Sequence, residues 1–226
     1  MRVSCYTGLV IALTGIATPG YSAPPRIEKG AVVVTLSNGA VRRLETGSAA
    51  FDLWTSPDNS LIAFATADSH LRTTVDDPDP LYKSSSIYVA AEDRDYAPVL
   101  LLRGPLKIGS LKLERFNSPR FGPGRKTIYV KGGYTMTTDV ILAIDIDSRK
   151  VRFVGYATDF RVIWGGQYSG ELIFMIRHLP YNGSEGISYE CRVGASPEKS
   201  RLVKANCVDF LGFTREWAGK NGAMDR

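Results

Sequence analysis

The sequence of 226 residues has little that could carry out a reaction, and its only two histidines are His70 and His178. Neither has cysteine or carboxylate neighbours at the spacing of zinc ligands, which argues against a histidine metal centre. A Gly-x-Ser-x-Gly elbow, the turn that presents a nucleophilic serine in many hydrolases, is also lacking. Turn glycines such as Gly132-Gly133 precede no helical pattern that could offer its N-terminus to a phosphate. No catalytic and no metal-ligating residue is assigned.

The chain also lacks a strong excess of charge of either sign. Lys and Arg number 28 against 23 Asp and Glu, which gives a formal net charge of +5. The basic residues are scattered among the expected strands and form no block of five or six. This distribution argues against nucleic acid as a partner.

Long apolar runs are absent, and the longest near the N-terminus, Gly8 to Ala17, is well short of the roughly 20 residues of a membrane span. It follows the basic start Met1-Arg2 and precedes small residues at Ser22 and Ala23, as in a secretory signal peptide. We therefore expect residues 1–22 to be a signal peptide and residues 23–226 to be a single domain. The mature protein is expected to be periplasmic or secreted, with no membrane span.

Cysteine is scarce, with three residues in all. Cys5 lies in the expected signal peptide, so the mature chain retains Cys191 and Cys207. A lone pair in an oxidising compartment predicts a disulfide. The alternative is two separate buried thiols.

Helical periodicity is hard to find after residue 25, whereas short β-branched and aromatic runs recur between turn residues. The clearest hairpin joins Ala31 to Leu36 with Ala40 to Leu44 through Asn38-Gly39, because both central residues of a type I′ turn need positive φ. Three more hairpins are predicted: Ile87 to Ala91 with Pro98 to Leu102, Val140 to Ile146 with Lys150 to Val154, and Ile187 to Val193 with Arg201 to Ala205. Each resembles an outer strand pair.

A second kind of unit, a turn followed by an apolar strand, lies between these hairpins. The copies are Trp54 to Phe64, Phe121 to Val130 and Trp164 to Phe174. Their apolar strands at Ile128 and Leu172 are separated by about the 40–45 residues of a four-stranded propeller blade. Trp54 and Trp164 stand at the starts of these units and are expected in the core.

The turn Ser56-Pro57-Asp58-Asn59, the strand Ile62-Ala63-Phe64 and the strand Ile87-Tyr88-Val89 resemble the repeat of TolB-like β-propellers. The resemblance covers most of Ala31 to Ala205 and implies an all-β, propeller-like fold with about three to four antiparallel blades in a small or incomplete ring. An orphan segment, Cys207 to Phe213, follows the last hairpin. It could share a blade with the N-terminal hairpin and close the ring, or the chain could be an open propeller or half of a homodimer.

The most unusual segment is Ala67 to Ser85, a long insertion between two strands of the first complete unit. Loops on a rigid β scaffold commonly carry binding residues. The candidate binding residues are His70, Arg72, Asp76, Asp77, Asp79 and Tyr82. Calcium held by Asp76, Asp77 and Asp79 is a weaker hypothesis, because Pro78 and Pro80 interrupt any familiar ligand spacing. A solvated loop without a role remains the plain alternative.

These observations favour an exported, non-enzymatic binding or scaffold module that presents loops to a protein partner in the cell envelope. Two alternatives stay open, the first from the resemblance and the second from the small size, the expected disulfide and the lack of catalytic groups. One is a small calcium-assisted propeller enzyme of the lactonase or lyase kind, and the other is an exported inhibitor or immunity protein. At the C-terminus, Phe210, Leu211, Phe213 and Trp217 are interpreted as an aromatic plug that fixes the chain end to the core.

Overall fold

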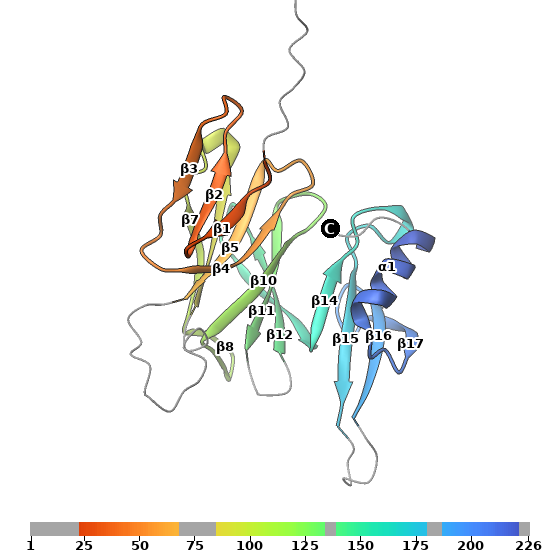
Figure 1. Ribbon diagram of the computed structural model, residues 1–226. Coiled ribbons are helices and arrows are strands. Elements are labelled where there is room, and N and C mark those ends of the chain that lie inside the picture. The colour runs from red at the N-terminus through yellow and green to blue at the C-terminus, as the bar shows by residue number, and fades with distance from the viewer. Residues whose placement is uncertain (1–22, 68–84, 134–138, 180–186, 222–226) are drawn as a thin grey trace, which may run out of the picture.

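The computed structural model describes residues 23–67, 85–133, 139–179 and 187–221. These residues form antiparallel sheets that follow one another along the chain, and one helix at the C-terminal end (Figure 1). The first sheet contains β1 (Arg26–Glu28), β2 (Ala31–Thr35) and β3 (Val41–Leu44). The second contains β4 (Ala50–Thr55), β5 (Leu61–Ala67), β6 (Ser85–Ala91) and β7 (Val99–Arg103).

A short hairpin of β8 (Leu106–Ile108) and β9 (Leu111–Leu113) leads to the third sheet. That sheet contains β10 (Arg115–Phe121), β11 (Thr127–Gly133), β12 (Asp139–Asp145) and β13 (Val151–Ala157). The fourth contains β14 (Asp159–Val162), β15 (Leu172–His178), β16 (Ser188–Gly194) and β17 (Ser200–Ala205). Within each sheet the strands pair in chain order.

All four predicted hairpins are outer strand pairs: β2–β3, β6–β7, β12–β13 and β16–β17. The β2–β3 turn contains Gly39 at φ 82°, and the Asn38 side chain accepts a hydrogen bond from the Ala40 N–H at 2.9 Å. The three predicted turn-and-strand units are the inner pairs β4–β5, β10–β11 and β14–β15. The prediction of repeated four-stranded units is therefore confirmed.

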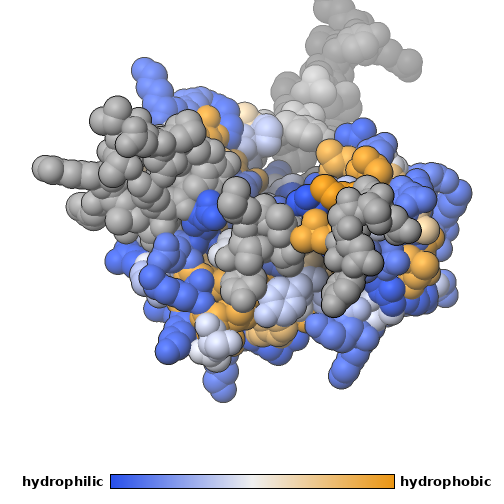
Figure 2. Space-filling model, turned by 90° about the horizontal axis from the view of Figure 1, so that it is seen from below, coloured by the Kyte–Doolittle hydropathy of each residue, from blue (hydrophilic) through white to orange (hydrophobic). Residues whose placement is uncertain are grey.

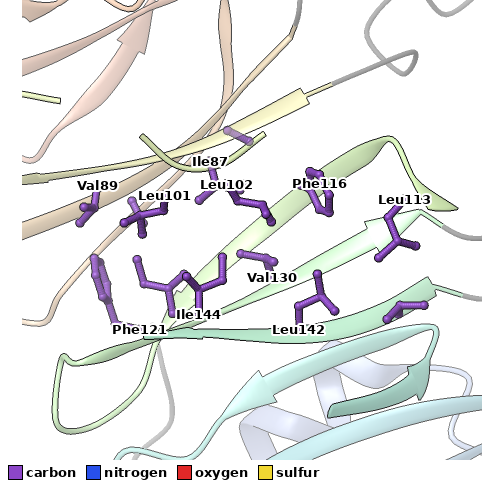
Figure 3. Packing of buried hydrophobic residues seen from close by; sticks show 14 of the residues in the cluster. Ile87, Val89, Leu101, Leu102, Leu113, Phe116, Phe121, Val130, Leu142 and Ile144 are labelled. Atoms are coloured by element: carbon purple, nitrogen blue, oxygen red, sulfur yellow. The ribbon is translucent and has the colours of Figure 1, made fainter. Parts of the chain in front are cut away.

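Apolar layers between successive sheets form the core. Val32, Val34 and Leu44 of the first sheet pack against the second sheet. The largest layer lies between the second and third sheets, where Ile87, Val89, Leu101 and Leu102 face Phe116, Phe121, Val130, Leu142 and Ile144 (Figure 3). Another layer, with Phe160 and Phe174, joins the third sheet to the fourth.

The C-terminal segment does not form the closing strand that was one of the alternatives from the sequence. It folds into helix α1 (Phe210–Asn221), which packs on the fourth sheet, and no closed ring is formed by the described residues. The Asp209 carboxylate accepts the Gly212 N–H at 2.8 Å and caps the helix start. Phe210, Phe213 and Trp217 are buried at helical spacing, whereas Leu211 is 52% exposed, so only the three aromatic residues of the expected cluster fix the chain end to the core.

The arrangement is an open arc of sheets, with the first sheet at one end and the fourth sheet with α1 at the other (Figure 1). Among the described residues, no helix has the length and hydropathy to cross a bilayer.

Candidate functional site

All six candidate binding residues from the sequence lie outside the described residues. They are His70, Arg72, Asp76, Asp77, Asp79 and Tyr82. The structure describes the two residues that flank this segment, Ala67 and Ser85, which we call its base. The last residue of β5, Ala67, donates its N–H to the Ala49 carbonyl at 2.9 Å. The first residue of β6, Ser85, donates its N–H to Glu114 O at 3.1 Å.

Ser85 fixes this base to the third sheet. Its side chain is buried, and its Oγ donates to the Phe116 carbonyl at 2.8 Å and accepts the Phe116 N–H. Its own carbonyl accepts the Gly104 N–H at 3.0 Å. Two strands that belong to different sheets are therefore joined at the point where the inserted segment begins and ends.

The corresponding strand pairs of the third and fourth sheets end at the same side of the molecule (Figure 1). We call this side the loop end. It contains the paired strand ends Ala67 and Ser85, Gly133 and Asp139, and His178 and Ser188. Hydrophilic side chains dominate its rim, with hydrophobic residues visible between them (Figure 2).

A half-buried ionic group joins the third and fourth sheets at the loop end. Lys131 Nζ lies 3.5 Å from Asp139 Oδ2 and donates to the Thr158 carbonyl at 3.4 Å. Burial raises the pKa of Asp139, and the negative charge of the nearby Asp159 adds to this increase. The positive charges of Lys131 and Arg115 partly offset it. This group connects the third sheet to the start of the fourth, because Thr158 directly precedes β14.

His178 is the last residue of β15 and lies at the loop end. Its Nε2 is 3.2 Å from Glu190 Oε2, and the same oxygen is 3.3 Å from Arg192 Nη1. Arg192 also donates from Nε to Ser200 Oγ at 2.9 Å, which links three strands of the fourth sheet. The His178 side chain is 48% exposed, so these contacts form a surface chain.

The inner strands β4 and β10 are joined by two contacts that sequence reasoning missed. Asp52 Oδ2 accepts the Ser118 N–H at 2.6 Å. The buried Arg120 guanidinium lies 3.5 Å above the centre of the Trp54 ring, in a cation–π contact. Trp54 itself is only partly buried, and no local sequence signal relates it to an arginine 66 positions away.

At the opposite end, the Asp58 carboxylate holds the predicted turn together and reaches the third sheet. Oδ1 accepts hydrogen bonds from Ser56 Oγ at 2.7 Å and Ser60 Oγ at 3.0 Å, and Oδ2 lies 2.6 Å from Arg125 Nη1. Burial tends to raise the pKa of Asp58, but these hydrogen bonds and the Arg125 charge outweigh it and lower the pKa to about 2. A hollow of about 480 Å³ beside Arg125 is lined by Ser60, Leu61, Glu92 and Asp93.

The predicted disulfide between Cys191 and Cys207 is present, with a Cα–Cα distance of 5.7 Å and both residues fully buried. It joins β16 to the residues just before α1. Among the described parts of the chain, no group of three or more His, Cys, Asp or Glu residues could hold a metal ion. The calcium hypothesis concerned residues 76–79, which lie outside those parts.

Comparison with solved structures identifies the fold as a β-propeller. The β-propeller domain of the Trilobed protease from Pyrococcus furiosus, described as having an open velcro topology, aligns over 82% of this chain with a TM-score of 0.53 and 15% identity. Tricorn protease aligns over 82% of this chain with a TM-score of 0.54 and 11% identity. TolB from Acinetobacter baumannii aligns over 77% of this chain, with a TM-score of 0.45 and 12% identity.

The alignments span only part of these proteins, namely 58% of the Trilobed protease domain, 16% of tricorn protease and 38% of TolB. The similarity therefore concerns the fold, and the expected propeller resemblance is confirmed at that level. No family model and no curated protein matches the sequence.

Proposed function

We propose that the protein is an exported binding module whose loop end contacts a protein partner in the cell envelope. The observation that carries this proposal is the anchoring of the inserted segment. Its base is tied to the third sheet through the buried Ser85 and to the β3–β4 connection through Ala67. A rigid base reduces the conformational entropy that a loop loses when it binds a partner.

Export is supported by two features far apart in the sequence. The N-terminal 22 residues have the basic start, short apolar stretch and small residues of a signal peptide. The buried Cys191–Cys207 disulfide is the kind of bond that persists in oxidising compartments. These two features support the proposal that the protein is periplasmic or secreted.

Export is tested by expressing the full chain and identifying the N-terminal residue of the protein in the periplasmic fraction by mass spectrometry. Ala23, or Pro24 if cleavage follows Ala23, is the expected first residue. Recovery of a chain that begins at Met1 in the cytoplasmic fraction alone would overturn this part of the proposal.

Partner binding is tested by capture from envelope extracts with immobilised residues 23–226. The variant Asp76→Asn/Asp77→Asn/Asp79→Asn changes the candidate loop. Its matched control, Glu92→Gln/Asp93→Asn/Asp147→Asn, removes the same number of carboxylates from exposed turns. We expect the control to capture the same protein as the wild type and the loop variant to lose it. Capture of nothing, or equal capture by both variants, would contradict the proposal.

A further inference from the structure

A surface hollow of about 330 Å³ lies at one end of the first sheet, where the chain leaves β3 and passes towards β4. It is lined by the β1–β2 turn, residues 29–31, and by residues 43–49 at the end of β3 and in the connection to β4. The hollow adjoins the base of the inserted segment, because the Ala49 carbonyl accepts the Ala67 N–H at 2.9 Å. It therefore belongs to the loop end, but it is formed entirely by described residues.

The lining has a surplus of positive charge. Lys29 and Arg43 contribute two cations, against the single carboxylate of Glu45. Lys29 has no ion-pair partner within the described chain. Arg43 is held weakly, since Nη2 lies 3.4 Å from the Glu28 carbonyl and Nε lies 3.8 Å from a Glu45 oxygen. The Glu45 side chain is 77% exposed, so water screens its charge.

Backbone donors add to these cations. Within the described residues, the N–H groups of Thr46, Gly47 and Ser48 donate to no acceptor. Gly47 has φ 77°, a conformation that turns the chain sharply here, and the Thr46 hydroxyl braces the bend by donating to the Ser48 carbonyl at 3.1 Å. Successive free N–H groups beside Lys and Arg are the groups that proteins use to bind carboxylates and other oxyanions.

We propose that this hollow binds an acidic side chain, Asp or Glu, of the protein partner. The inference rests on the proposed function, because it adds the chemistry of one contact at the same loop end. The two cations would pair with the carboxylate, and the donors of residues 46–48 would fix its orientation. The neighbouring Glu28 carboxylate does not compete, because it pairs with Arg26 at 2.5 Å.

The hollow is tested with a defined probe. The blocked tripeptide Gly-Asp-Gly is titrated into ¹⁵N-labelled residues 23–226, with blocked Gly-Asn-Gly as the uncharged control. We expect saturable shifts of the Thr46, Gly47 and Ser48 amide signals with the aspartate peptide at millimolar concentration, and at least fivefold weaker binding of the asparagine peptide. Absence of these shifts, or equal shifts with both peptides, would overturn the proposal.

The charge requirement is tested with Lys29→Gln/Arg43→Gln, matched by Lys107→Gln/Lys150→Gln, which removes two exposed cations elsewhere. The first variant should weaken the aspartate peptide at least fivefold and the second should leave it unchanged. Lys29→Gln alone replaces an exposed turn residue and serves as the test if the double variant folds poorly. Equal binding to both double variants would contradict the assignment.

Extract capture separates this inference from the proposed function. Weaker capture by Lys29→Gln/Arg43→Gln, with full capture by its control, supports the docked carboxylate. Full capture by both, with loss only in the Asp76, Asp77 and Asp79 variant, would leave the proposed function intact and refute the hollow. A third outcome concerns the aspartate peptide. If it binds only to the Asp76, Asp77 and Asp79 variant, the chain's own acidic residues compete for the hollow, and the proposal that a partner carboxylate binds there is refuted.

Discussion

Asp58 stabilises a turn and also connects the second sheet to the third. Three donors, Ser56, Ser60 and Arg125, converge on its two oxygens. Because the group is partly exposed, each contact contributes modestly, and we expect Asp58→Ala to lower the free energy of unfolding by about 1–2 kcal/mol. Urea unfolding at pH 7, with Asp93→Ala as an exposed control, measures the difference. A loss no larger than that of the control would contradict this prediction.

The pH dependence of Asp58 has a definite sign. Its pKa is about 2 in the folded protein, below the value near 4 expected for an unfolded chain. The stabilisation is therefore complete above pH 4 and is lost as the pH falls towards 2. Melting curves between pH 5 and pH 2 should show a shallower loss of stability in Asp58→Ala than in the wild type. Parallel curves would show that the carboxylate does not titrate as described.

Ser85 illustrates a different kind of residue, a buried hydroxyl that satisfies two backbone groups of another sheet. Ser85→Ala would leave the Phe116 N–H and carbonyl without this partner, so we expect a loss of about 1–3 kcal/mol in unfolding free energy. Ser37→Ala, in an exposed turn, is the control and should change stability little. An equal effect of the two substitutions, measured by urea unfolding, would rule out this role.

At the scale of elements, α1 depends on both packing and a covalent bond. Phe210, Phe213 and Trp217 are buried against the fourth sheet, and the Trp217 ring lies 5.4 Å from that of Tyr168. The disulfide closes a loop with a sequence separation of 16, which corresponds to about 3 kcal/mol of stabilisation. We expect Cys191→Ala/Cys207→Ala to lower stability by about that amount.

The structure also predicts which elements lose stability when the disulfide is removed. Hydrogen exchange of the double cysteine variant should accelerate first in α1 and β17, because they are the outermost elements on this side of the arc. Amides of β5 and β11, which lie inside their sheets, should keep their protection. Uniform acceleration through all four sheets would instead indicate that the bond stabilises the molecule as one cooperative unit.

The strands were predictable because their signals are local. Asn38-Gly39 and Ser56-Pro57-Asp58-Asn59 encode turns within a few residues, and alternating apolar runs on either side encode strands. Helix α1 was missed because its twelve residues include two glycines and few apolar residues beyond the buried aromatics. Contacts such as Trp54–Arg120 and Ser85–Phe116 could not be predicted, since they depend on how whole sheets pack.

For the whole molecule, the two ends of the arc decide whether it can bind a second copy. The fourth sheet presents its outer face to α1, which occupies the apolar surface around Ile173 and Val193. In the first sheet, the register places Arg26 and Arg43 on either side of Val33, on the face away from the second sheet. Val33 is 1% exposed, and the two cationic residues that flank it are about half exposed, so this face presents charge to the solvent.

These covered ends favour a monomer over the homodimer that the sequence left open. If two molecules packed end to end, the contact would either bury Arg26 and Arg43 or displace α1. Both changes cost free energy, whereas dimerisation through an exposed apolar sheet face would not. Light scattering coupled to size exclusion should give the mass of one chain, below the 24.8 kDa of the full sequence, over a range of protein concentrations. A mass of two chains that persists on dilution would mean that one end opens to a partner copy, and Arg26→Glu/Arg43→Glu would then identify which end is used.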